Sequence, residues 1–427
     1  MSRNIPPVTG MKDVLGADID VWQHVERTAA ALLASYGYGE IRVPVVEHTE
    51  LFKRAIGEYT DVVEKEMYTF TDLGGDSLTL RPEATAGIVR AAISNGLLRG
   101  ARLKLWCQGP MFRHEKPQKG RYRQFNQIDV EAIGFTGPDV DIELIALTAR
   151  LWKLLGLTRV SLQINSLGTP ESRKAYRELL QSYFRQHLDS LDADGKRRLD
   201  GNPLRILDSK HPPTQALVAN APVLTDHLDE ESQAHFAELR AGLTALGIAY
   251  TVNPRLVRGL DYYSRTVFEW ITDALGSQDA ICSGGRYDGL IAQMGGEATP
   301  AIGFAMGVER VTELVRLAGM NPKPQGPDVF VMAQGEVGQR TALVLAEQLR
   351  DAFPGRGILV HCGSAKFKTQ FRRADESGAR LALIVGEDEL ARGVIALKPL
   401  RGAETTQSEY PLAELRARVD EFFRRST

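Results

Sequence analysis

The chain is poor in cysteine and holds no long apolar run, and these absences exclude several classes of protein. It has 3 cysteines in 427 residues, Cys107, Cys282 and Cys362. An odd number of widely separated thiols argues against a disulfide framework and fits a reducing compartment. Without a Cys-x-x-Cys pair, no zinc knuckle is expected. No apolar run approaches the roughly 18 residues of a membrane span, so we expect no membrane partner.

The sequence also lacks an excess of charge of either sign. Lys and Arg total 52 and Asp and Glu total 54, which gives a net charge of −2. A basic coat over the whole surface is therefore excluded, and any contact with nucleic acid must come from local patches. The opening residues, MSRNIPPVTGMKD, lack the apolar core of a signal peptide, so we expect a cytoplasmic protein.

Several common motifs of nucleotide-binding and hydrolytic enzymes are absent. The sequence holds no Gly-x-x-x-x-Gly-Lys-Ser/Thr, no Gly-x-Gly-x-x-Gly, no His-Glu-x-x-His and no Gly-x-Ser-x-Gly. Chemistry on phosphate groups must then depend on arginines and a metal ion rather than on a P-loop.

Hydrophobic periodicity predicts the elements of the first three quarters of the chain. Apolar residues at three- and four-residue spacing predict helices over 21–35, 84–94, 141–155 and 307–317. Apolar and β-branched runs predict strands over 40–46, 103–112, 123–135, 161–164, 250–252, 266–271 and 279–282, and a hairpin over 67–80. Strands that are close in sequence pair most economically as antiparallel neighbours. We therefore expect an α+β domain with a mostly antiparallel sheet.

Two composition changes divide the chain. From about residue 170 the sequence is rich in charge and helix formers, which predicts a helical insertion over 170–235 within a domain formed by 1–169 and 236–320. The linker-like segment 318–327, AGMNPKPQGP, holds two Gly and three Pro. Beyond it, apolar runs alternate with helical stretches, which predicts a small α/β domain over 328–427.

The densest group of chemically active side chains lies in GPMFRHEKPQKGRYRQFNQIDVE, residues 109–131. Arg113 ends one predicted strand and Phe125 begins the next, so both face one concave surface. A guanidinium supplies a planar fork for phosphate oxygens, and an aromatic ring can stack on a nucleobase. Gln127 and Glu131 share one strand face because they are an even number of residues apart. This indicates a pocket lining, with a solvated loop and an exposed sheet face as the alternatives.

Three further segments carry polar groups at unusual density. In TLRPEATAG, residues 79–87, Glu83 either caps a helix or binds an ammonium group. LVRGLDYYSR, residues 256–265, is either a turn packed by aromatics or a binding segment. In AIGFAMGVER, residues 301–310, small residues permit a close approach of a ligand, and Glu309 alternatively sits at a helix N-terminus for electrostatic reasons alone.

Together these segments resemble class II aminoacyl-tRNA synthetases. The helix and strand that end at Pro44 resemble the first motif of the class, which lies at a dimer interface. Residues 112–115 with 124–125 resemble the second motif, and residues 303–310 resemble the third. LVRGLDYY and SGGRYDGL resemble segments of the histidyl-tRNA synthetase family in particular. The resemblance covers essentially the whole chain, although Thr9 and Ala84 stand where the family usually shows Arg and Gly.

The resemblance implies a class II catalytic domain, an anticodon-binding C-terminal domain and a homodimer. It implies a ligase that activates L-histidine with ATP and Mg²⁺ and transfers it to the 3′ end of tRNA(His). Catalysis is then assigned to Arg113 and Arg258, on two sides of the α-phosphate. The ATP-binding set adds Glu115, Arg121, Phe125 and Arg310. Mg²⁺ is expected on the phosphates of ATP and not in a site made of protein side chains alone.

The resemblance also implies which residues bind the amino acid and the tRNA. Glu83 pairs with the α-ammonium, and Glu131 and Tyr263 bond the two imidazole nitrogens. The rest of the histidine-binding set is Ala84, Thr85, Gln127 and Tyr262. The tRNA contacts are Lys116, Gln118 and Lys119 in the loop, and Lys366, Lys368 and Arg372 in the C-terminal domain. For the latter group, an alternative is a solvated face on a helix whose Phe367 and Phe371 are core.

Three alternative functions are compared with the motifs and domains that the sequence contains. An inactive regulatory subunit of histidine biosynthesis typically lacks the motif arginines and the C-terminal domain, and a tRNA-sensing module would carry a kinase segment. A ligase that shares only the second and third motifs would lack LVRGLDYY. For residues 170–235 we expect a clamp on the tRNA acceptor arm, so that deletion weakens tRNA charging and spares adenylate formation.

Overall fold

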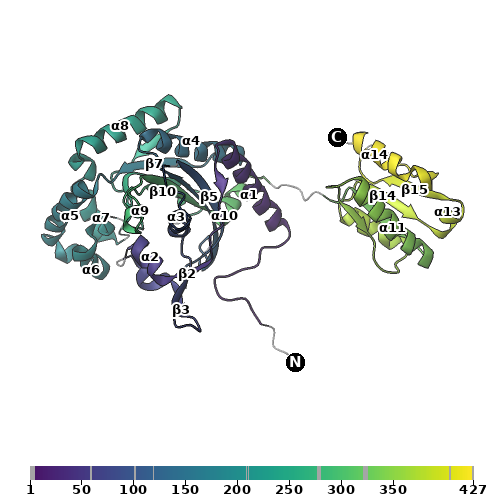
Figure 1. Ribbon diagram of the computed structural model, residues 1–427, viewed down its shortest axis with the longest axis horizontal. Coiled ribbons are helices and arrows are strands. Elements are labelled where there is room, and N and C mark those ends of the chain that lie inside the picture. The colour runs from purple at the N-terminus through teal and green to yellow at the C-terminus, as the bar shows by residue number, and fades with distance from the viewer. Residues whose placement is uncertain are drawn as a thin grey trace. The chain divides into compact units, whose positions relative to one another are not determined.

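The computed structural model describes residues 5–57, 60–100, 102–118, 120–207, 209, 211–276, 280–320, 326–402 and 405–425. The chain divides into two compact units, Met1–Pro322 and Lys323–Thr427 (Figure 1). Among the described helices, none combines the length and the apolar character that crossing a bilayer requires.

The main sheet of the larger unit has eight strands within the described residues, in the order β1-β5-β6-β11-β10-β9-β7-β8. The edge pairs β1–β5 and β7–β8 are parallel, and the pairs between them are antiparallel. The predicted mostly antiparallel sheet is therefore confirmed. In spatial order the strands are β1 (Gly39–Glu40), β5 (Leu103–Phe112), β6 (Gln124–Ile133), β11 (Ala301–Gly307), β10 (Ala280–Arg286), β9 (Ser264–Ile271), β7 (Ser161–Ser166) and β8 (Tyr250–Val252).

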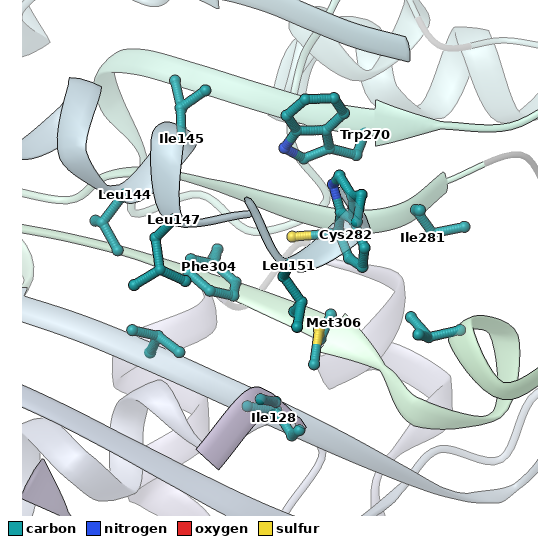
Figure 2. Close-up of a cluster of buried hydrophobic side chains, with 14 of the residues drawn as sticks. Ile128, Leu144, Ile145, Leu147, Leu151, Trp270, Ile281, Cys282, Phe304 and Met306 are labelled. Carbon is teal, nitrogen blue, oxygen red and sulfur yellow. The ribbon is translucent and has the colours of Figure 1, made fainter. Parts of the chain in front are cut away.

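One face of this sheet is covered by α1 (Ala17–Ser35), α4 (Pro138–Leu154), α8 (Glu230–Ala245) and α10 (Val308–Leu317), which share a hydrophobic core with the strands. Figure 2 shows part of this core, where Ile128, Phe304 and Met306 of neighbouring strands gather with Leu147 and Leu151 of α4. Because side chains alternate along a strand, burying Ile128 and Val130 here places Gln127, Asp129 and Glu131 on the opposite face.

That opposite face carries α2 (Thr49–Ile56), the π-helix η1 (Val62–Glu66), α3 (Thr85–Ser94), α9 (Leu290–Gln293) and a small sheet. The small sheet has the order β2-β4-β3, with β2 (Val46–His48), β3 (Tyr68–Thr71) and β4 (Ser77–Leu80). The predicted hairpin over 67–80 is confirmed. The predicted strand over 40–46 is wrong, because it is interrupted between β1 and β2, around Pro44. A proline has no N–H to give to a sheet ladder.

The insertion is helical, as predicted. It contains α5 (Pro170–Arg185), η2 (Leu188–Ser190), α6 (Ala193–Gly201), η3 (Pro203–Ile206), α7 (Pro212–Ala219) and η4 (Leu224–His227), and α5, α6 and α7 lie together in Figure 1. Asp192 caps α6 by accepting from the N–H of Gly195 at 2.8 Å. Tyr176, Leu180 and Phe184 recur at four-residue spacing on α5 and are buried in the core of the opposite face. The insertion therefore shares its core with α2 and α3.

The smaller unit has a five-stranded sheet in its described residues, in the order β13-β12-β14-β15-β16. Its core lies on both faces: α11 (Glu336–Ala352) and α14 (Leu415–Arg425) pack on one, and α12 (Phe367–Glu376) packs on the other. The predicted α/β domain is confirmed, while periodicity alone does not indicate β15, β16 or α14. The remaining elements are β12 (Val329–Ala333), β13 (Ile358–Val360), β14 (Leu381–Val385), α13 (Glu387–Ala391), β15 (Val394–Pro399), β16 (Ser408–Pro411) and η5 (Leu412–Glu414).

Candidate active site

A cavity of about 350 Å³ lies on the sheet face opposite the α1 and α4 helices. It gathers the polar residues that the sequence places in four separate segments. Ala84 is fully buried and is not among the lining residues given by the structure. The other predicted histidine- and ATP-binding residues all line it: Glu83, Thr85, Arg113, Glu115, Arg121, Phe125, Gln127, Glu131, Arg258, Tyr262, Tyr263 and Arg310.

Glu83 caps helix α3 at the wall of the cavity. Its carboxylate accepts from the backbone N–H of Thr85 and of Ala86, each at 2.9 Å. Burial raises the pKa of Glu83, while these N–H groups and the nearby Arg113 act in the opposite direction. The helix-capping interpretation is therefore correct. A carboxylate has about four acceptor positions, so the cap fixes Glu83 and leaves capacity for a ligand.

Glu131 is held between two hydroxyl groups. Thr85 Oγ1 donates to one carboxylate oxygen at 2.6 Å, and the Tyr287 hydroxyl donates to the other. Burial raises the pKa of Glu131 to about 8, against the lowering effect of both hydroxyl groups. Tyr287 was not identified as a site residue from the sequence. It lies in the SGGRYDGL segment, so its place in a family-specific segment was the available signal.

Asp129 is a second residue that sequence reasoning missed. It is 1% exposed and lies between Gln127 and Glu131 on the same strand face. Neither of its oxygens has a hydrogen-bond partner within the described residues. Burial raises its pKa to about 8, and the neighbouring Glu83 adds to that shift. The spacing rule that pairs Gln127 with Glu131 applies equally to Asp129, so the signal was present.

The arginines of the cavity are anchored by fixed acceptors. Arg113 Nε donates to the Pro82 carbonyl at 2.9 Å, and its guanidinium lies 5.3 Å from the centre of the Phe125 ring. Arg258 Nη1 donates to Glu269 at 2.7 Å. Each of these bonds uses one of the five N–H donors of a guanidinium, so both groups are oriented and retain donors. Glu269 is a third site residue that the sequence analysis did not identify.

Another part of the cavity wall comes from the loop at 120–122 and from Glu309 and Arg310 of helix α10. Arg310 Nε donates to the Gly120 carbonyl at 3.0 Å, and Glu115 forms an ion pair with Arg121. Glu309, in the first turn of α10, accepts from the backbone N–H of Asn126 at 2.8 Å. The bonds of Glu309 and Arg310 connect the third motif, residues 303–310, to the segment that contains the second motif. Glu309 therefore holds the start of β6 in addition to its place at the N-terminus of α10.

The residues predicted to bind tRNA lie outside this cavity. Lys116 and Gln118 are exposed in the loop, and Lys119 lies outside the described residues. Lys366, Lys368 and Arg372 are exposed on or beside α12. Phe367 and Phe371 pack against buried residues of the smaller sheet, so the interpretation of this pair as core is correct.

The described part of the chain was compared with the requirements of a metal site built from protein side chains alone. Among the described residues, no group of three or more His, Cys, Asp or Glu side chains is arranged to hold an ion. Glu115 and Glu269 of the cavity are each already paired with an arginine. This donor set suits a Mg²⁺ ion that is held mainly by phosphate oxygens and water.

Comparisons with known proteins agree on one family. A family model described as histidyl-tRNA synthetase matches residues 10–311, and one described as anticodon binding domain matches residues 328–422. The chain is similar to the apo histidyl-tRNA synthetase of S. aureus, with 35% identity, a TM-score of 0.81, and coverage of 98% of this chain and 100% of that one.

Two more distant structures show the fold alone. The histidyl-tRNA synthetase of Nostoc sp. PCC 7120 is 20% identical, with a TM-score of 0.68 over 98% of this chain and 100% of that chain. A Bacillus halodurans protein described as an ATP phosphoribosyltransferase regulatory subunit/histidyl-tRNA synthetase is 21% identical, with a TM-score of 0.63 over 90% of this chain and 99% of that chain.

Proposed function

Because the chain belongs to the histidyl-tRNA synthetase family and is an aminoacyl-tRNA ligase, we propose that it activates L-histidine with ATP and transfers the histidyl group to the 3′ end of tRNA(His). One observation carries this proposal: a single cavity combines Arg113, Arg258 and Arg310 with the buried acids Glu83 and Glu131. Arginines suit phosphate oxygens, and buried acids suit the ammonium and imidazole of histidine.

In the first step, a histidine carboxylate oxygen attacks the α-phosphorus of ATP and pyrophosphate leaves. Arg113 and Arg258 are assigned to the α-phosphate oxygens, where charge develops in the transition state. Their anchors at Pro82 and Glu269 hold them in place before substrate arrives. A carboxylate is ionised at neutral pH, so this step requires no general base.

The ATP would lie between the second and third motifs. Phe125 is assigned to stack on adenine, Glu115 and Arg121 to orient the base, and Arg310 to contact the adenine or the phosphate tail. A Mg²⁺ ion bound with ATP would supply positive charge to the phosphates and so favour the departure of pyrophosphate. The ion pair of Glu115 with Arg121 and the bond from Arg310 to Gly120 support this assignment, since they keep these groups at one end of the cavity.

The amino acid would bind over β6. Glu83 is assigned to the α-ammonium with help from Thr85, and Gln127 to the carboxylate or main chain. Glu131 and Tyr263 are assigned to the imidazole nitrogens, with Tyr262 packed beside Tyr263 at 4.7 Å between ring centres. Polar partners on both nitrogens reject amino acids that lack them by roughly 10⁴–10⁵-fold.

Family membership supports further proposals about assembly and tRNA. The smaller unit is assigned to the anticodon and the loop at 116–119 to the acceptor end, in a cytoplasmic homodimer. The mass of the particle in solution, measured by light scattering, tests the dimer. A monomer that is active in histidine transfer would contradict it.

Charging of tRNA(His) with labelled histidine and ATP tests the whole reaction. We expect charging that requires ATP and that Arg258→Ala abolishes, with Arg159→Ala as the control because Arg159 is exposed and pairs with Asp273. A folded protein that binds histidine and charges no tRNA would contradict the proposal. It would then favour the regulatory role printed for the Bacillus halodurans protein.

A further inference from the structure

The segment 255–263 carries five residues that line the cavity and has no regular structure of its own. Arg258, Tyr262 and Tyr263 line the cavity, and no residue from 253 to 263 is in a helix or a strand. Segments without internal hydrogen bonding are the least stable parts of a fold unless other elements hold them. Glu269 orients the Arg258 guanidinium, while the backbone position of Arg258 depends on what the segment is bonded to.

Elements outside the insertion supply two of those bonds, from Asn165 to the Leu256 carbonyl at 3.0 Å and from the Asp261 N–H to the Ile56 carbonyl at 3.2 Å. The helical insertion supplies further bonds at the end of the segment nearest the tyrosines. Arg205 of η3 donates to the carbonyl of Gly259. Asn202 donates through Nδ2 to the carboxylate of Asp261 at 2.7 Å. Arg173 of α5 donates to the carbonyl of Tyr263, with a second, longer contact of 3.4 Å to the carbonyl of Asp261.

At the other end of the segment, the segment supplies the donor and the insertion supplies the acceptors. The Arg255 guanidinium donates to the carbonyls of Ala219, Ala221 and Pro222, at 3.2, 2.9 and 3.1 Å. Ala219 ends α7, and Ala221 and Pro222 lie between α7 and η4. The insertion thus brackets the segment from both ends.

The insertion also holds the neighbouring wall of the cavity. Arg198 of α6 pairs with Asp61 at 3.1 Å, and Arg197 pairs with Glu64 of η1 at 2.7 Å. Val62 of η1 lines the cavity. Hydrogen bonds in which one partner is charged are stronger than neutral ones, so this is a dense set of contacts between the insertion and the amino-acid site.

We propose that the insertion is a positioning element of the amino-acid site, in which Arg173, Asn202 and Arg205 hold segment 255–263 so that Arg258, Tyr262 and Tyr263 face the substrate. The inference rests on the proposed function. It changes the expectation for residues 170–235: a clamp on tRNA alone leaves histidine activation untouched, whereas a positioning element alters it in the absence of tRNA.

The test is histidine-dependent exchange of pyrophosphate into ATP by full-length variants, without tRNA. For Arg173→Ala and Arg205→Ala we expect a rise of about tenfold or more in the KM for histidine or a matching loss of kcat/KM, the size expected for losing a charge-assisted bond. The KM for ATP should change less, because Arg258 is the one residue of the ATP-binding set that belongs to segment 255–263. Arg205→Lys, which keeps a cationic donor, should recover part of the loss.

Arg185→Ala is the matched control. Arg185 lies on α5 like Arg173, is 58% exposed at its side chain, and pairs with Asp200 of the insertion itself at 2.8 Å. Thermal denaturation of every variant separates loss of position from loss of fold. If an arginine variant fails to fold, Asn202→Ala decides, since it removes a single neutral donor and should still raise the KM for histidine several-fold.

The outcomes distinguish the inference from the proposed function. Folded Arg173, Asn202 and Arg205 variants that match Arg185→Ala in an active enzyme would overturn the inference and leave the function in place. A wild-type protein that neither exchanges pyrophosphate nor binds histidine by calorimetry would overturn both. A wild type that binds histidine without exchange would overturn the function, and the histidine affinity of the variants would then decide the inference.

Discussion

Gly303 of β11 lies directly opposite Glu131 of β6, and a Cβ atom at Gly303 would fall 1.7 Å from a carboxylate oxygen of Glu131. No side chain fits at that position while Glu131 keeps its place. The carboxyl group therefore lies over bare backbone, held by Thr85 on one side and Tyr287 on the other. A glycine in the third motif is thus a requirement of the amino-acid pocket.

The first prediction concerns this contact. Gly303→Ala must displace Glu131, and we expect a loss on the order of 10²-fold in kcat/KM for histidine, the cost of moving a site group by about 1 Å. Pyrophosphate exchange at varied histidine measures it. Gly289→Ala is the control, because a Cβ there meets nothing within 4 Å. Equal activity of the two variants would show that the pocket does not depend on Glu131.

The second prediction concerns Tyr287. Tyr287→Phe removes one of the two donors to Glu131 and leaves the ring, so we expect about a tenfold rise in the KM for histidine and little change for ATP. Because the hydroxyl lowers the pKa of Glu131, its loss should raise that pKa further. The part of the pH profile for histidine binding that follows the ionisation of Glu131 should then move to higher pH. An unchanged KM and an unchanged profile would contradict this role.

The third prediction concerns Asp129 and pH. Its pKa is raised from 3.8 to about 8 by burial, so between these values the folded protein binds more protons than the unfolded chain. Stability from this group is therefore present below about pH 4 and lost as the pH rises toward 8. Melting temperatures are measured at several pH values. The melting temperature of Asp129→Asn should rise relative to that of the wild type as the pH rises. A constant difference, like that of the exposed control Asp189→Asn, would refute it.

The fourth prediction concerns Arg258. Arg258→Lys keeps the charge and loses the planar fork, so we expect kcat for exchange to fall on the order of 10²-fold. Arg159→Lys, at an exposed pair with Asp273, should have no effect. A wild-type rate in Arg258→Lys would show that a point charge is sufficient at the α-phosphate.

The fifth prediction separates the two units. Changing Lys366, Lys368 and Arg372 together to Ala should leave pyrophosphate exchange unchanged, raise the KM for tRNA and reduce the salt dependence of tRNA binding. Arg340→Ala on the exposed side of α11 is the control. A change in exchange, or no change in tRNA binding, would contradict the assignment of this face.

Local sequence pattern was sufficient for much of the fold, because alternation along β5 and β6 and the helical spacing of α1 and α4 are local properties. It failed around Pro44, where residues 41–45 lie in no strand and separate β1 from β2, and where proline has no N–H to give to a sheet ladder. The C-terminal strands β15 and β16 escaped notice because their burial depends on packing against β14 rather than on their own pattern.

The site could be predicted as a set of residues but not as a set of contacts. Segment resemblance indicated Arg113, Glu131 and Arg258, and the structure places them in one cavity. Tyr287 lies 156 residues beyond Glu131 in the chain, and only the register of β6, β11 and β10 brings the two together. The bonds from the insertion to segment 255–263 are equally non-local, so the sequence suggested a tRNA clamp and gave no sign of a second role.

The most direct test of the account is pyrophosphate exchange into ATP measured with each of the twenty amino acids and no tRNA. The account predicts exchange with histidine alone, since Glu131 and Tyr263 are assigned to the two imidazole nitrogens. Exchange with a different amino acid would preserve the fold and overturn those assignments. No exchange by the folded protein would contradict the claim that this cavity forms an aminoacyl-adenylate.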